Sequence, residues 1–241
     1  MALLEVQGLS KSFRGLRAVD NASFAVEAGA IVALIGPNGA GKTTCFNLIA
    51  GALPPDAGTV TLDGRLLTGL SADRACHAGI GRTFQVVKPF GQLSVLDNVT
   101  VGALRATADV AAAQQEARRV LELLHLERKA GELAATLTLP ERKRLEVARA
   151  LATSPKLLLL DEVMAGLRPT EIDEMVAVFR RLNRETGLTI LLVEHVMRAV
   201  MALAHRIIVL HHGEIIAEGA PDAVVRDPAV LASYLGGAPA A

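Results

Sequence analysis

The glycine-rich stretch at residues 36–44, GPNGAGKTT, restricts what this chain can fold into more than any other segment. It follows an apolar run at 31–35, typical of a short buried strand, and it leads into 45–50, which has the pattern of a helix. Its ends fit the spacing G-x-x-x-x-G-K-[ST], in which small residues let successive backbone N–H groups surround a phosphate. We therefore expect a phosphate-binding loop between a strand and a helix.

The loop supplies the expected nucleotide ligands, which are Gly36, Pro37, Asn38, Gly39, Ala40, Gly41, Lys42, Thr43 and Thr44. Lys42 would place its charge against the β- and γ-phosphates of ATP, and the Thr43 hydroxyl would bind Mg²⁺. The helix that follows adds the partial positive charge of its N-terminus. The alternative is a glycine-rich turn without a ligand, but the full motif and both of its flanks favour the phosphate loop.

Apolar runs separated by helical patterns predict the rest of the core. Residues 156–162 and 188–194 have the pattern of strands that are covered on both faces, and a helix from Thr170 to near Gly187 separates them. This alternation is typical of parallel βαβ units, whose ligands gather at the carboxyl ends of the strands. The predicted fold class is α/β, a P-loop ATPase core with a largely parallel sheet.

Short strands are expected at 3–9, as an edge strand, at 23–26 and at 58–63, in an antiparallel β subdomain, and a hairpin is expected at 205–217. Residues 86–136 change character and include an alanine-rich helical pattern at 109–127. A capping box at Thr138 then opens a helix to about 153. We expect one domain over residues 1–241, with a core at 1–85 and 155–241 that includes a C-terminal extension. A helical lobe is expected at about 86–154.

Charge and hydropathy exclude some classes of protein. The chain has 25 basic and 25 acidic residues, so it lacks the basic field that binds nucleic acid without sequence preference, and we expect no nucleic-acid partner. No stretch approaches the roughly 18 to 20 apolar residues of a transmembrane helix, and the N-terminus does not have the pattern of a signal peptide. These features predict a soluble, cytosolic chain.

A pair of carboxylates follows the apolar run at 157–160. Asp161 is expected to bind Mg²⁺, since the second strand of a P-loop ATPase supplies a carboxylate there. Glu162 is placed to orient and deprotonate the attacking water. An acidic pair at any strand end can instead face solvent, but its combination with the P-loop favours the catalytic interpretation.

Two further candidates are weaker by themselves. His195 comes one residue after the strand expected at 188–194 and could contact the γ-phosphate, although a single histidine at a strand end is more often structural. Phe13 is an aromatic residue in an expected polar loop at 11–15, where it could stack on adenine. A loop phenylalanine folded back on the sheet is an equal alternative.

In the order and spacing of these motifs, the whole chain resembles the nucleotide-binding subunits of ABC transporters. The resemblance assigns Phe13 to adenine stacking, Gln85 to the joint between core and helical lobe and to the catalytic and Mg²⁺ sites, and His195 to the switch histidine. It implies a head-to-tail dimer that encloses two ATP molecules and drives integral membrane permease subunits. The chain is then expected to be peripheral, at the cytoplasmic face of the inner or plasma membrane.

Within that family, residues 81–85, 165–169, 193–195 and 227–236 are similar to the ATPase subunits of branched-chain amino acid importers. The signature loop departs from the family pattern Leu-Ser-Gly-Gly-Gln, because this chain has LTLPE at 137–141. Thr138 remains as a candidate contact to the partner's ATP. We therefore expect a heterodimer with a second ATP-binding subunit, with a homodimer as the alternative.

Two other functions remain open from the sequence. An ABC-type ATPase could act on DNA or on a soluble complex, but its DNA-handling relatives carry long coiled-coil insertions, and 86–136 is too short for one. A regulator could hold ATP without turnover, as the unusual signature suggests. The presence of Glu162 and His195 argues against that reading.

Overall fold

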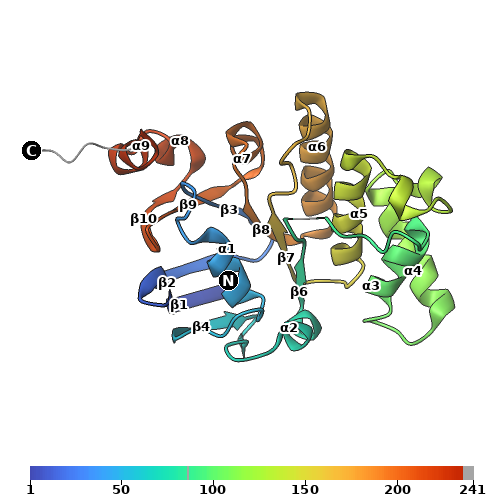
Figure 1. The fold of residues 1–241 in the computed structure, drawn as a ribbon, viewed down its shortest axis with the longest axis horizontal. Helices are drawn as coiled ribbons and strands as arrows, with labels where there is room; N and C mark the ends of the chain where they lie inside the picture. The colour runs from blue at the N-terminus through green and yellow to red at the C-terminus, as the bar shows by residue number, and fades with distance from the viewer. Residues whose placement is uncertain (86, 236–241) are drawn as a thin grey trace, which may run out of the picture.

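The computed structural model describes residues 1–85 and 87–235, and its centre is a six-stranded sheet (Figure 1). The strand order is β10 (Glu214–Gly219), β9 (Arg206–His211), β3 (Ile31–Ile35), β8 (Thr189–Val193), β7 (Leu157–Asp161) and β6 (Ile80–Arg82). All neighbouring pairs from β9 to β6 are parallel, and β10 pairs antiparallel with β9. Strands β3, β7 and β8 are buried along their whole length, which explains their uninterrupted apolar sequences.

A second sheet is antiparallel. Its order is β2 (Leu16–Glu27), β1 (Ala2–Phe13), β4 (Ala57–Leu62) and β5 (Arg65–Leu66). Strand β1 lies between β2 and β4, so the expectation of an edge strand at 3–9 was wrong. Both β1 and β2 are 12 residues long, and their pairing contains several register shifts. Residues 11–13 are partly or largely exposed and include the polar Lys11 and Ser12, and for this reason their sequence has the pattern of a loop.

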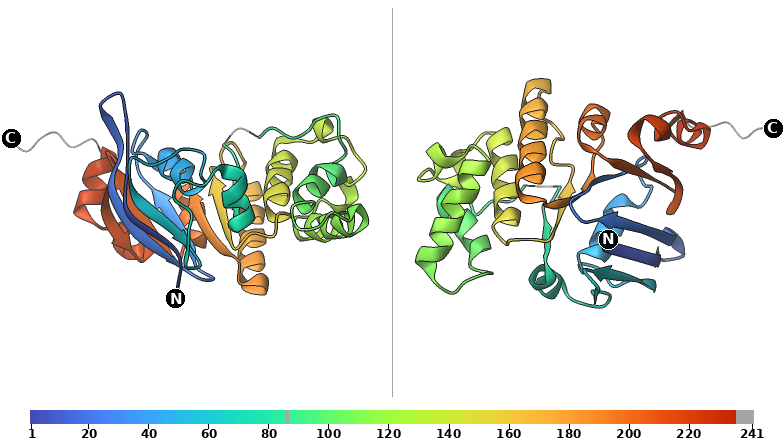
Figure 2. Two further views of the ribbon diagram at one scale, coloured as in Figure 1. Left: turned by 90° about the horizontal axis from the view of Figure 1, so that it is seen from below. Right: turned by 180° about the vertical axis from the view of Figure 1, so that it is seen from behind.

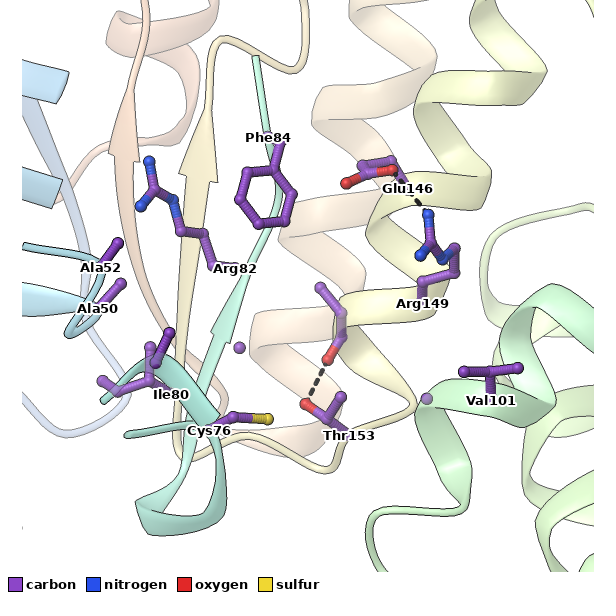
Figure 3. A pocket seen from close by; sticks show the side chains of 14 residues that line it. Ala50, Ala52, Cys76, Ile80, Arg82, Phe84, Val101, Glu146, Arg149 and Thr153 are labelled. Atoms are coloured by element: carbon purple, nitrogen blue, oxygen red, sulfur yellow. Dashed lines mark hydrogen bonds and ion pairs between the residues drawn. The ribbon is translucent and has the colours of Figure 1, made fainter. Parts of the chain in front are cut away.

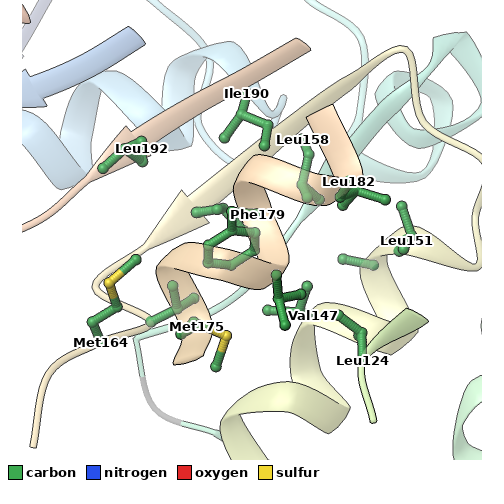
Figure 4. Packing of buried hydrophobic residues seen from close by; sticks show 14 of the residues in the cluster. Leu124, Val147, Leu151, Leu158, Met164, Met175, Phe179, Leu182, Ile190 and Leu192 are labelled. Carbon is green, nitrogen blue, oxygen red and sulfur yellow. The ribbon is translucent and has the colours of Figure 1, made fainter. Parts of the chain in front are cut away.

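The parallel sheet packs on both faces because alternate side chains of each strand point to opposite sides. In β7, Leu157 and Leu159 join the core between the two sheets, which also includes Phe46 from helix α1. Leu158 and Leu160 join the other core, where Phe179 and Leu182 of α6 cover the sheet, as Figure 4 shows for part of this cluster.

The helices are α1 (Lys42–Ile49), α2 (Ala72–Ala78), α3 (Val95–Ala103), α4 (Val110–Leu123), α5 (Leu139–Leu151), α6 (Pro169–Thr186), α7 (Met197–Leu203), α8 (Pro221–Val224) and α9 (Pro228–Leu235), with 3-10 turns at Glu127–Lys129 and Ala134–Thr136. Helices α3 and α4 lie at one end of the molecule and α8 and α9 at the other, as the views in Figures 1 and 2 agree. The predicted fold class, including the antiparallel sheet, is confirmed. Helices α7 and α8 were not predicted, since each has two turns or fewer and too little sequence to show a period.

Side-chain caps fix where the helices between β6 and β7 begin. The Ser94 hydroxyl accepts a hydrogen bond from the Asp97 N–H at 3.0 Å, and the Asp109 carboxylate accepts one from the Ala111 N–H at 2.9 Å. The alanine-rich helix ends at Leu123, four residues before the expected end. Among the described residues, no helix is both long enough and apolar enough to cross a membrane.

Candidate functional site

The loop between β3 and α1 is held against two other strands. Gly36 and Gly41 have φ angles of 152° and 103°, which favour glycine. A Cβ atom on Gly36 would lie 2.0 Å from the Leu210 carbonyl oxygen, and one on Gly41 would lie 2.0 Å from that of Ala18. Neither position can carry a side chain without movement of the backbone, so β9 and β2 together determine the shape of the loop.

Helix α1 begins at Lys42 with its first N–H groups directed at this loop. Its N-cap, Gly41, has no side chain to accept from them, and its first turn contains no acidic residue. The arrangement favours an anion at the helix N-terminus. The Lys42 ammonium group is buried and donates to the carbonyls of Gly36 at 2.8 Å and Pro37 at 2.9 Å. Burial lowers the pKa of Lys42, and the charges of Glu162 and Asp161 oppose this effect.

Glu162 receives contacts from two other strand ends. Its Oε2 atom accepts a hydrogen bond from Gln85 Nε2 at 2.8 Å, and its Oε1 atom lies 2.6 Å from His195 Nε2. Gln85 follows β6, Glu162 follows β7 and His195 follows β8, so the parallel sheet brings all three to the same edge. Glu162 itself has a φ angle of +50°, which is uncommon for a residue with a side chain.

Asp161 is the last residue of β7 and is almost completely buried. Its Oδ2 atom accepts from Arg82 at 3.1 Å, whereas Oδ1 has no hydrogen-bond partner within residues 1–85 and 87–235. Burial raises the pKa of Asp161, and its hydrogen bond with Arg82 opposes the rise.

Asp161, Thr43 and Gln85 line one pocket of about 450 Å³. A carboxylate, a hydroxyl and an amide are oxygen donors of the kind that Mg²⁺ takes beside phosphate and water. The unpaired Oδ1 atom of Asp161 and these donors fit Mg²⁺. The described residues contain no cluster of three His, Cys, Asp or Glu that could hold a metal without a phosphate.

Most of the predicted residues meet at an open pocket of about 730 Å³, lined by Asn38, Gly39, Gly41, Lys42, Thr43, Thr44, Gln85, Glu162 and His195. The described residues that line it do not include Phe13 or Thr138. Phe13 ends β1, is 43% exposed and lies near the Lys11 ammonium, which is 5.9 Å from the ring centre. The expectation that Phe13 lies in a loop was wrong, although its hairpin partner β2 does touch the P-loop through Ala18.

Thr138 is the N-cap of α5, and its polar groups bind within the chain. Its N–H and its hydroxyl both donate to Glu141 Oε2, each at 2.8 Å. The backbone N–H of Thr138 is the main cause that lowers the pKa of Glu141. Leu139, the next residue, is 40% exposed. The loop therefore presents an apolar side chain and an engaged hydroxyl.

Three residues near the site were not identified from the sequence. Arg82 donates to Asp161 and also to Asn47 Oδ1 at 2.7 Å. Lys143 and Glu194 are buried beside Glu162 and Met164. Each is a charged residue next to a recognised motif, but only the folded chain shows that it points inward.

A third cavity, of about 330 Å³, lies between β6, α2, α3 and α5 (Figure 3). Arg82, Phe84, Glu146, Arg149 and Val101 are among its lining residues. The Arg149 guanidinium lies 3.4 Å from the Glu146 carboxylate. It also lies 4.5 Å from the ring centre of Phe90, which is 45% exposed.

Known proteins resemble this chain over nearly its full length. The family described as ABC transporter matches residues 19–165, and the family described as branched-chain amino acid ATP-binding cassette transporter matches 214–240. The high-affinity branched-chain amino acid transport ATP-binding protein BraF of Pseudomonas aeruginosa is 37% identical, over 97% of this chain and 98% of its own. The lipopolysaccharide export system ATP-binding protein LptB of Escherichia coli is also 37% identical, over 98% of each chain.

Solved structures agree with the sequence matches. The ADP conformation of MJ1267, an ATP-binding cassette of an ABC transporter, has a TM-score of 0.89 and 30% identity, covering 98% of this chain and all of its own. The dimeric bacterial ABC transporter cassette MJ0796 has a TM-score of 0.82 and 26% identity, covering 90% and 98%. A family match over more than half of the chain and full-length relatives at 37% identity show that this chain belongs to the ATP-binding proteins of ABC transporters.

Proposed function

We propose that this chain binds and hydrolyses Mg-ATP to drive the import of branched-chain or related amino acids through separate permease subunits. The observation that carries the ATPase part is the contact of Glu162 with Gln85 at 2.8 Å and His195 at 2.6 Å, beside the P-loop. The overall identity to BraF and to LptB is the same, 37%, and does not distinguish their substrates. The family match at 214–240 favours amino acids over lipopolysaccharide as the transported substrate.

In this mechanism Lys42 and the N-terminal N–H groups of α1 bind the phosphates, and Glu162 accepts a proton from water while the water oxygen attacks the γ-phosphorus. The bond from the γ-phosphorus to the bridging oxygen breaks, and ADP leaves with that oxygen. His195 would hold the second Glu162 oxygen through Nε2, and it lines the pocket in which the γ-phosphate would bind. Thr43, Gln85 and Asp161 would hold Mg²⁺, which supplies charge stabilisation when bound.

Recovery of the tagged chain from native membranes tests this proposal directly. We expect integral membrane subunits and an amino acid-binding component in the complex, and ATP hydrolysis that rises when the amino acid is supplied. A chain that is recovered only with soluble proteins or nucleic acid would contradict the transport function. A complex that turns over ATP in response to a lipid instead would contradict only the substrate class.

The permease would dock at the cavity between β6 and α5, on the side of Phe84 and Phe90. The segment between Gln85 and α3 contributes the apolar residues Val87 and Phe90 to this surface, and Val86 lies outside the described residues. Phe90 is fixed from behind, since its N–H donates to the buried Asn98 side chain at 2.9 Å and its ring packs on Arg149. An exposed aromatic ring on a fixed backbone is suited to bind a partner. Docking there would keep the chain at the cytoplasmic face of the membrane.

Phe90→Ala is expected to reduce recovery of the permease complex by about tenfold, as for a typical interface hot spot, while basal ATPase activity and thermal stability hold. The matched control is Leu231→Ala, because Leu231 is similarly exposed at 48% but lies on α9, at the other end of the molecule. An intact complex would count against docking at Phe90. A marked fall in melting temperature would instead assign the ring to packing within the chain.

We also propose that the chain pairs with a different ATP-binding subunit. Pro140 has no N–H to offer to the partner's nucleotide, Leu139 blocks close approach, and the Thr138 hydroxyl is engaged with Glu141. A homodimer would use this loop twice. A heterodimer would complete the P-loop site described above with the intact signature of the other subunit.

Replacing Leu139 and Pro140 by glycine is expected to raise the ATP turnover of the isolated chain at least tenfold, because even one restored charge-assisted donor is worth about 1.5 to 3 kcal/mol. The measurement is phosphate release at saturating ATP. The melting temperature shows whether the substitutions destabilise the first turn of α5. The heterodimer proposal is contradicted if the isolated wild-type chain already hydrolyses ATP as fast as the complex, or if the glycine variant hydrolyses it no faster than wild type.

A further inference from the structure

Two charged side chains are buried behind the pocket and take no part in the mechanism above. Lys143 lies in the second turn of α5 and is 5% exposed, and Glu194 directly follows β8 and is 2% exposed. Buried charges are costly unless they are paired or hydrogen-bonded. The contacts of Lys143 and Glu194 therefore indicate their role.

Both contacts are to the main chain around Glu162. The Lys143 ammonium group donates to the Glu162 carbonyl at 3.1 Å, and Glu194 Oε1 accepts from the Met164 N–H at 2.8 Å. The Glu162 N–H itself donates to the Val193 carbonyl at 2.9 Å. The peptide groups on both sides of Glu162 are thus held by side chains and backbone from α5 and from the end of β8.

Glu162 needs this support because its φ angle of +50° is sparsely populated for a residue with a side chain. The turn that starts there directs its carboxylate back to Gln85 and His195. If the Glu162 carbonyl lost its donor, the peptide could rotate towards a more common conformation. The carboxylate would then leave its contacts without any change in the P-loop.

The charge around Lys143 is balanced by several carboxylates. Burial lowers the pKa of Lys143, and Glu194, Glu162, Glu146 and Asp161 oppose this effect. Burial also raises the pKa of Glu194, which the N–H groups of Met164 and His195 oppose. The helix that carries Lys143 is packed into the core directly after it, with Leu145 and Val147 completely buried.

We propose that Lys143 is a positioning residue for hydrolysis, which fixes the main chain of Glu162 so that its carboxylate faces the attacking water. This inference rests on the proposed role of Glu162 as the base. Because α5 begins at the signature loop, the hydrogen bond from Lys143 to Glu162 also connects the signature loop with the catalytic glutamate of the same chain. A shift of α5 relative to β7 would move the Glu162 carbonyl.

The test compares Lys143→Met, which keeps the length but removes the donor, with Lys143→Arg, which keeps the charge and donor. In the complete transporter complex, Lys143→Met is expected to lower kcat about 100-fold, the effect of a misplacement of about 1 Å. The ATP dissociation constant and KM should stay within about threefold of wild type. Lys143→Arg should recover at least a tenth of the wild-type kcat. Lys156→Met is the control, because Lys156 is exposed and forms an ion pair with Asp63, which has no place in the mechanism above.

An unchanged kcat in Lys143→Met overturns the inference. A loss of ATP affinity in proportion to the loss of kcat also overturns it, because Lys143 would then support the fold of the whole pocket rather than the position of Glu162. If the methionine variant does not fold, Lys143→Gln takes its place, and equal kcat values for Gln, Arg and Lys overturn the inference. Glu162→Gln, measured in parallel, separates the two proposals. Full activity in that variant refutes the role of Glu162, whereas its inactivity beside a fully active Lys143→Met refutes only the positioning role.

Discussion

Glu162→Gln is expected to lower ATP turnover by about 100- to 10,000-fold, the usual contribution of a general base, while ATP binding is retained. The amide fits the same contacts, because its oxygen can accept from Gln85 and its NH₂ group can donate to a neutral His195 Nε2 atom. The shape of the site is therefore kept and only the proton acceptor is lost. Since closure on ATP no longer leads to opening, the variant should accumulate as an ATP-bound dimer.

Single-turnover phosphate release, ATP titration and the oligomeric state in the presence of Mg-ATP measure these three effects. Glu185→Gln is the matched control, because Glu185 is an exposed glutamate near the end of α6. Turnover close to that of wild type would remove Glu162 from the role of base. A loss of binding together with turnover would instead indicate that the charge of Glu162 holds the fold of the pocket.

The parts of the fold that could be predicted from the sequence are those whose cause is local. Strand β7 was expected at 156–162 and is found at Leu157–Asp161, because a strand covered on both faces must be apolar throughout. The P-loop was predicted because its glycines, Lys42 and Thr43 are adjacent in sequence. Strand β1 was expected to end at residue 9 but reaches Phe13, since its half-exposed positions carry polar residues that also occur in loops.

The contacts that depend on how α5 sits against β7 could not be predicted. Lys143 belongs to a charged stretch, ERKR at 141–144, in which nothing local distinguishes the buried lysine from its exposed neighbour Arg142. The sequence likewise does not distinguish Arg82 from other basic residues. The parallel pairing of β6 with β7 places it beside Asp161. The strand-end rule placed Glu162 and His195 at the same edge of the sheet as the P-loop, and Gln85 was assigned only from the family resemblance, but neither argument could give their hydrogen bonds.

Lys42→Ala is expected to weaken nucleotide binding itself, in contrast to Glu162→Gln. The lysine places the charge that faces the β- and γ-phosphates, and loss of one or two charge-assisted hydrogen bonds at about 1.5 to 3 kcal/mol each lowers ATP affinity by about 10- to 10,000-fold. Alanine also leaves the carbonyls of Gly36 and Pro37 without the donor that they have in this structure. The effect on order in the loop should therefore be confined to these two carbonyl groups.

Titration with ATP, followed by calorimetry or by a fluorescent nucleotide, measures the affinity. Lys129→Ala provides a control, because Lys129 is partly exposed and lies in a 3-10 turn outside the pocket. The melting temperature without nucleotide should change little, since the positive φ angles of Gly36 and Gly41 and their contacts with β9 and β2 are untouched. The stabilisation that ATP gives to the wild-type chain should disappear, because a ligand stabilises only the state to which it binds. Unchanged ATP affinity in Lys42→Ala would contradict the assignment of residues 36–44 as the nucleotide-binding loop, and with it the mechanism that starts from that loop.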